Sequence, residues 1–282
     1  MKLDWKTTMS PDPYAIPLEL DVLDTILRDD KADTASFSQQ VLSYLEDADF
    51  GLLDLNAHCD GYESFKTAAT RIAEAFGTLM VQNDAGDTVV EVWDRNIGRI
   101  EDGVRYHQTR QGGDIHTDSV NRPDPMKLLI LGSATTALIG GESIIIRARE
   151  VCERLAAYPE VEDILRKPFF FEGRGMSEEI ELFQLPVLAG SADKPDFRYL
   201  RSYIASAHER AGWPLTTDQI FAFDVLDAFN EMSDLQHRFT LQQGQLLLAF
   251  DTRVFHGRTS FVDGVTPDAW SKGRRMLRYW IE

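Results

Sequence analysis

Gly112-Gly113-Asp114-Ile115-His116-Thr117-Asp118 is the stretch that says most about the fold of this chain. Residues two apart on a strand point to the same face, so His116 and Asp118 can both face the inside of a barrel while Thr117 points away. A second histidine stands far downstream, in Val254-Phe255-His256-Gly257-Arg258-Thr259. Two imidazoles and one carboxylate form the facial set that holds non-haem Fe(II) and leaves three positions open. This pattern predicts a barrel that encloses a metal site.

The His-x-Asp pair is weak evidence by itself, because a chain with 46 acidic residues and six histidines often produces such a pair by chance. The remaining histidines compete for the same role. We expect His208, in a helical pattern with charged neighbours, to be solvated, and His58 and His237 to be peripheral. His107 either lines the site or is an ordinary loop residue.

Composition restricts the partners of the chain. Its 282 residues, 43% hydrophobic and 27% charged, suit one soluble globular domain with a sizeable core. The net charge of -17 would repel phosphate backbones and anionic lipids, so we expect no nucleic acid and no membrane partner. The start of the sequence lacks a signal-peptide core, and Cys59 and Cys152 have no metal-ligand spacing, which favours a reducing, cytoplasmic setting.

Two regions differ in their periodicity. Residues 1–100 predict a mainly helical N-terminal part, with helices from about Thr34 and from about Ser64 to Gly77, and short strands at Phe50–Leu55 and Thr88–Trp93. Residues 101–282 predict a jelly-roll core with inserted loops and helices. Its strand-like runs, rich in branched and aromatic residues, are Lys127–Ser133, Glu142–Ile146, Leu182–Leu188, Arg238–Leu241, Gln245–Phe250, Arg258–Val262 and Met276–Ile281.

Helices and loops interrupt these strands. The expected helices are Ala148–Tyr158, Arg198–Ala211 and Thr217–Met232, and the expected loops are Lys167–Pro195 and Asp263–Gly273. We expect the triple phenylalanine Phe169–Phe171 to pack in the core or in a lid. The fold class is therefore α+β, a double-stranded β-helix (jelly roll) with flanking helices, in a single domain over residues 1–282.

A second group of candidate functional residues is basic. In Arg274-Arg275-Met276-Leu277-Arg278, strand alternation places Arg274 and Arg278 on one face and Arg275 on the other. Two arginines on one buried face are costly unless they meet an anion, and guanidinium groups match carboxylates with two parallel hydrogen bonds. The alternative is a surface strand paired with the protein's own acidic residues.

Taken in order, these motifs resemble the taurine dioxygenase and clavaminate synthase-like family of Fe(II)- and 2-oxoglutarate-dependent oxygenases. The resemblance rests on four motifs over about residues 105–282, namely His116-x-Asp118, Gly140-Gly141-Glu142-Ser143, Phe250-Asp251-x-Arg253-Val254-x-His256-Gly257-Arg258-Thr259-x-Phe261 and Arg274-x-x-x-Arg278. The first third of the chain resembles the family only in its mainly helical character.

The resemblance implies roles for individual residues. His116, Asp118 and His256 would bind Fe(II), and Arg274 and Ser143 would bind the distal carboxylate of 2-oxoglutarate. Arg278 would contact the co-substrate or an anionic group of the substrate. A slip of one residue would give the role of Arg274 to Arg275. The family's usual residues before the distal histidine are replaced by Asp251-Thr252-Arg253, a departure that we expect to leave the metal untouched.

The implied reaction is hydroxylation of a small molecule, or its desaturation or cyclisation, with release of succinate and CO2. Asp118 argues against halogenation, because halogenating members have a small apolar residue there. An amino acid or a biosynthetic intermediate is the expected substrate, with Arg105, His107 and Arg110, and the insertion from Phe169 to Arg174, as candidate pocket walls. Two alternatives remain at this point: a non-redox barrel that binds a ligand or another metal, and a Zn-dependent hydrolase.

Overall fold

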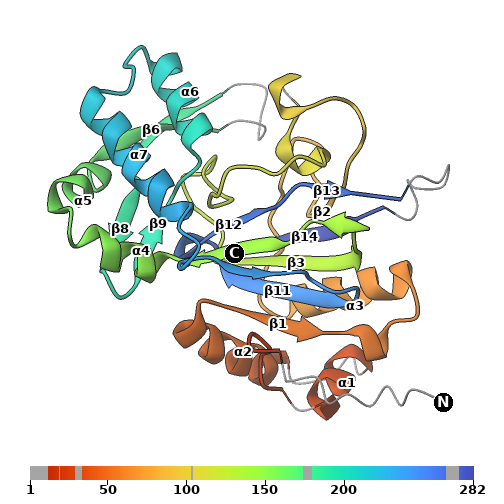
Figure 1. Cartoon of the computed structure of the whole chain (residues 1–282). Coiled ribbons are helices and arrows are strands. Elements are labelled where there is room, and N and C mark those ends of the chain that lie inside the picture. Colours follow the sequence, from red (N-terminus) through yellow and green to blue (C-terminus); the bar gives the residue numbers. More distant parts are fainter. Residues whose placement is uncertain (1–11, 19, 29–33, 103, 174–179, 265–272) are drawn as a thin grey trace, which may run out of the picture.

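Two antiparallel sheets form the centre of the structure, and helices cover their outer faces (Figure 1). The structure is a computed structural model that describes residues 12–18, 20–28, 34–102, 104–173, 180–264 and 273–282. The predicted mixture of helix and sheet is confirmed. Within the described residues no helix has the length and apolar character needed to cross a bilayer.

The larger sheet has five strands in the order β1-β11-β3-β14-β2. Their bounds are Phe50–Asp54 (β1), Gln245–Phe250 (β11), Leu128–Thr135 (β3), Arg275–Ile281 (β14) and Val89–Val92 (β2). The two edge strands thus come from the first hundred residues, as the sequence predicted strands at these places. Because side chains alternate along β14, Leu277 and Tyr279 pack under the helices, whereas Met276 packs between the sheets.

The smaller sheet has three strands in the order β10-β5-β12, with bounds His237–Phe239 (β10), Ser143–Arg147 (β5) and Val254–Arg258 (β12). Ile145 and Val254 share a buried cluster with Leu247 and Met276 of the larger sheet. Ile146 and Phe255 point the other way, into a cluster with the inserted helices. The two sheets therefore face each other across a common apolar layer.

Three helices cover the outer face of the larger sheet: α1 (Leu20–Arg28), α2 (Thr34–Ala48) and α3 (Tyr62–Glu74). Phe37, Val41 and Leu45 of α2 recur at four-residue intervals and are all buried, as the spacing predicts. The helix expected from Ser64 begins two residues earlier, because the Ser64 hydroxyl caps its first turn by accepting the N–H groups of Asp60 and Gly61. Helix α1 was not predicted.

The segment between β5 and β10 forms a lobe of helices and short strands behind the smaller sheet (Figure 1). The expected helix at residues 148–158 ends at Leu155, and α5 starts anew at Pro159, the favoured first position of a helix. Much of the expected loop 167–195 is in fact strand, because Phe169 and Phe171 alternate inward and are buried. The lobe contains α4 (Ala148–Leu155), α5 (Pro159–Leu165), β6 (Pro168–Glu172), β7 (Leu182–Pro186), β8 (Leu188–Gly190), β9 (Pro195–Phe197), α6 (Arg201–Ala211) and α7 (Thr217–Asn230).

Short elements complete the described chain. The expected strand 258–262 is divided, since β12 ends at Arg258 and β13 (Phe261–Val262) pairs with β4 (Ile139–Gly140). Most of the expected loop 263–273 lies outside the described residues. Single 3-10 turns lie at Asn56–His58 (η1), Ile100–Asp102 (η2), Tyr106–Gln108 (η3) and Asp251–Arg253 (η4).

Candidate functional site

The backbones of His116 and His256 are paired directly. The His116 N–H donates to the His256 carbonyl at 3.0 Å, and the His256 N–H donates to the His116 carbonyl at 2.8 Å. His116 lies in an extended segment outside any strand, whereas His256 is the middle residue of β12. Thr117 points away as predicted, with its hydroxyl accepting the Tyr199 N–H at 3.0 Å. The sequence-predicted ligands are thus brought together by one bridge between distant segments.

His116, Asp118 and His256 each offer one ligand atom, and these three atoms lie within 4.8 Å of one another. Asp118 Oδ1 is 3.6 Å from His116 Nε2 and 3.9 Å from His256 Nε2. All three side chains are at least 90% buried. This is the spacing and donor set that a facial two-histidine, one-carboxylate metal site requires.

A hydrogen bond orients His116, and burial keeps His256 neutral. His116 Nδ1 lies 2.7 Å from the Asp114 carbonyl and donates to it in the tautomer that leaves Nε2 free to face Asp118. Burial and the neighbouring His116 lower the pKa of His256 to about 3, so its imidazole is neutral and offers a lone pair. Burial raises the pKa of the Asp118 carboxyl, but Arg278 and the two histidines outweigh burial and hold that pKa well below its usual range.

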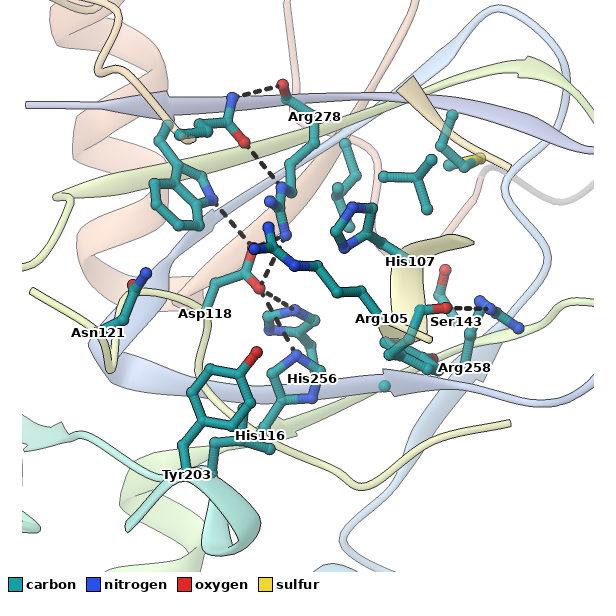
Figure 2. Close-up of a pocket in the computed structure, with 18 of the residues that line it drawn as sticks. Arg105, His107, His116, Asp118, Asn121, Ser143, Tyr203, His256, Arg258 and Arg278 are labelled. Carbon is teal, nitrogen blue, oxygen red and sulfur yellow. Dashed lines mark hydrogen bonds and ion pairs between the residues drawn. The ribbon is translucent and has the colours of Figure 1, made fainter. Parts of the chain in front are cut away.

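Two side chains of β14 hold the Asp118 carboxylate. Arg278 Nη1 is 3.2 Å from both carboxylate oxygens, and Trp280 Nε1 donates to Oδ2 at 3.0 Å. Figure 2 shows Arg278, Asp118 and His256 in line across the pocket. Arg278, expected to bind the co-substrate or the substrate, therefore lies beside the metal-ligand set and pairs with one of its members.

Asp251 holds the backbone of the loop that carries Asp118. Its buried carboxylate accepts the backbone N–H groups of Asp118 and Ser119 at 2.8 and 3.1 Å and the Ser119 hydroxyl at 2.7 Å. Burial and the charge of Asp118 raise the pKa of Asp251 to about 6. We expected this position to leave the metal untouched, and Asp251 does not face the ligand atoms. It nevertheless fixes the backbone that carries one of them.

Arg274 is buried at the end of the pocket, and its Nη1 has no hydrogen-bond partner among the residues that the structure describes. Burial lowers the pKa of its guanidinium to about 10, so it stays charged at neutral pH. Ser143 is buried in the same wall. Arg275 points the other way and stacks on Trp93 at 4.9 Å, which supports the alternation predicted for this strand.

Gly141 leaves room for the Arg274 side chain. The glycine has a φ of +74°, and a Cβ there would lie 3.0 Å from Arg274 Nε. The Tyr106 hydroxyl is also buried without a partner in the described chain, and its ring packs edge-on to His116 at 5.9 Å. Arg258 stacks on that ring at 4.5 Å and binds the carbonyls of Thr109 and Gln111 at 2.6 and 2.8 Å. Arg258 thus anchors the loop that carries Tyr106.

A cavity of about 160 Å³ joins these groups. Its remaining polar wall includes Arg105, His107, Asn121 and Tyr203. In Figure 2, Arg105 extends into the pocket toward Asp118, and Tyr203 and Asn121 lie beside the group of His116, Asp118 and His256. Burial and Arg278 lower the pKa of His107 to about 3, so this side chain is neutral.

Arg110 is placed elsewhere. It pairs with Asp94 at 2.5 Å and lines two neighbouring surface pockets rather than the metal pocket. Of the expected wall at residues 169–174, Phe169 and Phe171 are buried in the lobe, and Arg174 lies outside the described residues.

Sequence reasoning missed several pocket residues. Trp280 lies on the strand face of Arg274 and Arg278, so alternation could have identified it. Gln82 and Asn121 gave no comparable signal, because they enter the pocket from loops whose paths only the folded chain defines.

The chain is similar to known oxygenases. The model of the taurine catabolism dioxygenase TauD, TfdA family matches residues 50–280. The FR-33289 synthase of Streptomyces rubellomurinus (strain ATCC 31215) is 26% identical over 210 residues, or 73% of this chain. The match covers only 60% of that relative's length.

Two solved structures have the same fold. An asparagine oxygenase in complex with Fe(II), 2S,3S-3-hydroxyasparagine and succinate superimposes with a TM-score of 0.68 at 14% identity, covering 95% of this chain and 93% of that one. The non-heme iron oxygenase OrfP, in complex with Fe, succinate and (3S)-hydroxy-L-Arg, gives a TM-score of 0.62 at 13% identity, covering 94% and 93%.

Proposed function

Because this chain belongs to the taurine catabolism dioxygenase TauD, TfdA family, we propose that it is a 2-oxoglutarate-dependent non-haem iron dioxygenase that hydroxylates a small molecule. Its two sheets would form the jelly roll that the sequence predicts. The observation that carries the proposal is one pocket holding both a facial ligand set and a buried guanidinium whose Nη1 is unpaired within the described part of the chain.

The ligand set fits iron. Two imidazole nitrogens and one carboxylate oxygen converge on side chains that are at least 90% buried, and His116 has its second nitrogen beside a backbone carbonyl. His116, Asp118 and His256 would hold the metal. When bound, Fe(II) would supply, together with 2-oxoglutarate and O2, the oxidising power that removes a hydrogen from the substrate, with one oxygen atom of O2 going to succinate and CO2 released.

The opposite end of the pocket fits the co-substrate's distal carboxylate. A buried guanidinium needs an anion, and Arg274 Nη1 is a donor without an acceptor among the residues that the structure describes. The buried hydroxyls of Ser143 and Tyr106 lie in the same wall and can donate to the same group. The burial of the three ligand side chains would also limit the access of water to the reacting centre.

The substrate would enter on the side of Arg105, His107, Asn121 and Tyr203. We propose an amino acid or a similar small biosynthetic intermediate, with a carboxylate on Arg105 and hydrogen bonds to neutral His107. Structures of the same fold contain hydroxyasparagine and hydroxyarginine, which supports an amino acid of comparable size. Arg278 would border the substrate while it remains paired with Asp118.

An anaerobic titration tests the proposal. Without O2, the protein with Fe(II) and 2-oxoglutarate should develop a weak visible charge-transfer band. In a separate aerobic incubation with ascorbate, an amino-acid panel should show substrate-dependent succinate and a +16 or -2 mass shift. A well-folded protein without the band would refute the oxygenase. Activity with Zn(II) in the absence of O2 and 2-oxoglutarate would instead identify a hydrolase.

A ligand variant gives the matching prediction. Asp118→Ala should retain the fold but lose turnover and metal-dependent 2-oxoglutarate binding, because one of three protein ligands is gone. Circular dichroism checks that the variant is folded, and equilibrium dialysis measures its binding of Mn(II). Undiminished Mn(II) binding would show that the metal lies elsewhere.

A further inference from the structure

The two oxygens of the Asp118 carboxylate have different surroundings. Oδ1 is the oxygen near the ligand nitrogens, at 3.6 Å from His116 Nε2 and 3.9 Å from His256 Nε2. Oδ2 accepts the indole N–H of Trp280 at 3.0 Å. One hydrogen bond therefore distinguishes the oxygen that faces the site from the oxygen that does not.

We propose that Trp280 is a positioning residue that fixes the Asp118 carboxylate with Oδ1 toward the metal. This inference rests on the proposed function, since it assumes a metal at His116, Asp118 and His256. An aspartate side chain can rotate about its terminal bond, and its two oxygens are otherwise equivalent. The indole N–H removes that equivalence before any metal arrives, because a donor held at one oxygen selects one orientation.

The indole is itself held rigidly. Trp280 is 3% exposed and packs with Met80, Met126 and Leu129 in a small buried cluster at the pocket end of the larger sheet. Its backbone is fixed in β14, where it pairs with Leu129 of β3. A buried aromatic ring in a strand has little rotational freedom, so the N–H direction is set by the fold.

Arg278 adds a second restraint on the carboxylate. Its guanidinium lies over the Trp280 ring at 4.8 Å and contacts both oxygens of Asp118. Gln82 Oε1 accepts Arg278 Nε at 2.8 Å, and the Gln82 amide donates to the carbonyls of Thr88 and Arg278 at 2.8 and 2.9 Å. Arg278 neutralises the carboxylate's charge, whereas Trp280 alone singles out Oδ2.

The test compares two Trp→Phe substitutions. Trp280→Phe keeps an aromatic ring in the cluster and removes the N–H, and Trp213→Phe, at a tryptophan that is 70% exposed, is the matched control. Mn(II) affinity of the apo protein is measured by the EPR signal of the free ion. Trp280→Phe should bind Mn(II) about 10- to 100-fold more weakly, the effect of losing an outer partner of a metal ligand, and Trp213→Phe should match wild type.

The outcomes separate the two proposals. Wild-type protein that fails to bind Mn(II), or that binds it equally after Asp118→Ala, refutes the proposed function. Wild-type binding with an equal or higher affinity in Trp280→Phe overturns only the positioning role. A fall in both Trp variants also overturns it, because the effect would then not be specific to the Asp118 contact.

A second measurement covers a Trp280→Phe protein that does not fold. In ¹⁵N-labelled protein with the five native tryptophans, Asp118→Ala should shift one indole N–H signal strongly, because that N–H loses its carboxylate acceptor. Unchanged indole signals in a folded Asp118→Ala protein overturn the proposal.

Discussion

At the scale of single residues, Arg274 says most about what fills the pocket, because its charge is buried while one of its nitrogens lacks a partner within the described chain. Arg274→Ala should raise the KM for 2-oxoglutarate about 10- to 100-fold, since a hydrogen bond to a charged group contributes about 1.5–3 kcal/mol. Steady-state kinetics at saturating Fe(II) measure the change.

Arg275 provides the neighbouring control. It stacks on Trp93 and lies 3.7 Å from Glu91, outside the pocket. Arg275→Ala should leave the KM for 2-oxoglutarate within about twofold of wild type. The reverse result, with Arg275→Ala impaired and Arg274→Ala normal, would transfer the co-substrate role to Arg275.

At the scale of elements, the turn between β4 and β5 makes room for Arg274, the residue proposed to bind 2-oxoglutarate. Gly141→Ala should cost roughly 1–2 kcal/mol, because an alanine is strained at a φ of +74°, and should also raise the KM for 2-oxoglutarate by displacing Arg274. Gly86→Ala separates the two effects: Gly86 has a φ of +81°, and no described atom lies within 4 Å of the place its Cβ would take, so only stability should fall. An unchanged KM for 2-oxoglutarate in Gly141→Ala would show that the alanine does not displace Arg274.

The junction of α6 with β6 should make stability depend on pH. His208 is buried, accepts the Phe170 N–H on Nε2 at 3.1 Å, and has Nδ1 2.8 Å from the Trp213 carbonyl. Burial lowers the pKa of His208 below its ordinary 6.5. The unfolded chain therefore takes up the proton first as pH falls, and stability is complete above about pH 6.5 and declines below it.

Chemical denaturation at pH 7.5 and pH 5.5 checks this expectation. Wild type should lose more free energy of unfolding over that interval than His208→Gln, which cannot titrate. Equal losses would show that His208 does not contribute. The sequence predicted a solvated His208, and this was wrong because its apolar surroundings come from β6, a strand that the sequence did not identify.

The sequence predicted best those elements whose buried residues follow a single helix or strand periodicity. The run from Phe37 to Leu45 and the alternation around Arg278 each bury one face, so the sequence carries their structure locally. The strand β6 was missed because tertiary packing of Phe169 and Phe171 outweighs the local turn signals. Likewise, the grouping of His116, Asp118 and His256 was predictable from the order of the motifs, whereas the loops that bring in Gln82 and Asn121 were not.

At the scale of the whole molecule, the apolar core under helices α1 to α3 and the pocket lie on opposite faces of the five-stranded sheet. Leu45→Ala, at a fully buried position of α2, should lower the free energy of unfolding by about 2–5 kcal/mol. The KM for 2-oxoglutarate should stay unchanged, because the sheet separates the new cavity from the site. Denaturation and kinetics on the same sample test this, and a raised KM would reveal coupling across the sheet.

The mutual backbone pairing of His116 with His256 gives the metal a mechanical role. An ion held by both side chains closes a long loop of chain at the seam between the middle and the end of the sequence. It would then act as a non-covalent link that stabilises the folded chain, because the ion binds the assembled ligands and not the unfolded chain, where they are far apart. Without metal, local unfolding should begin at the backbone pairing of His116 with His256. Iron should bind only after the chain has folded.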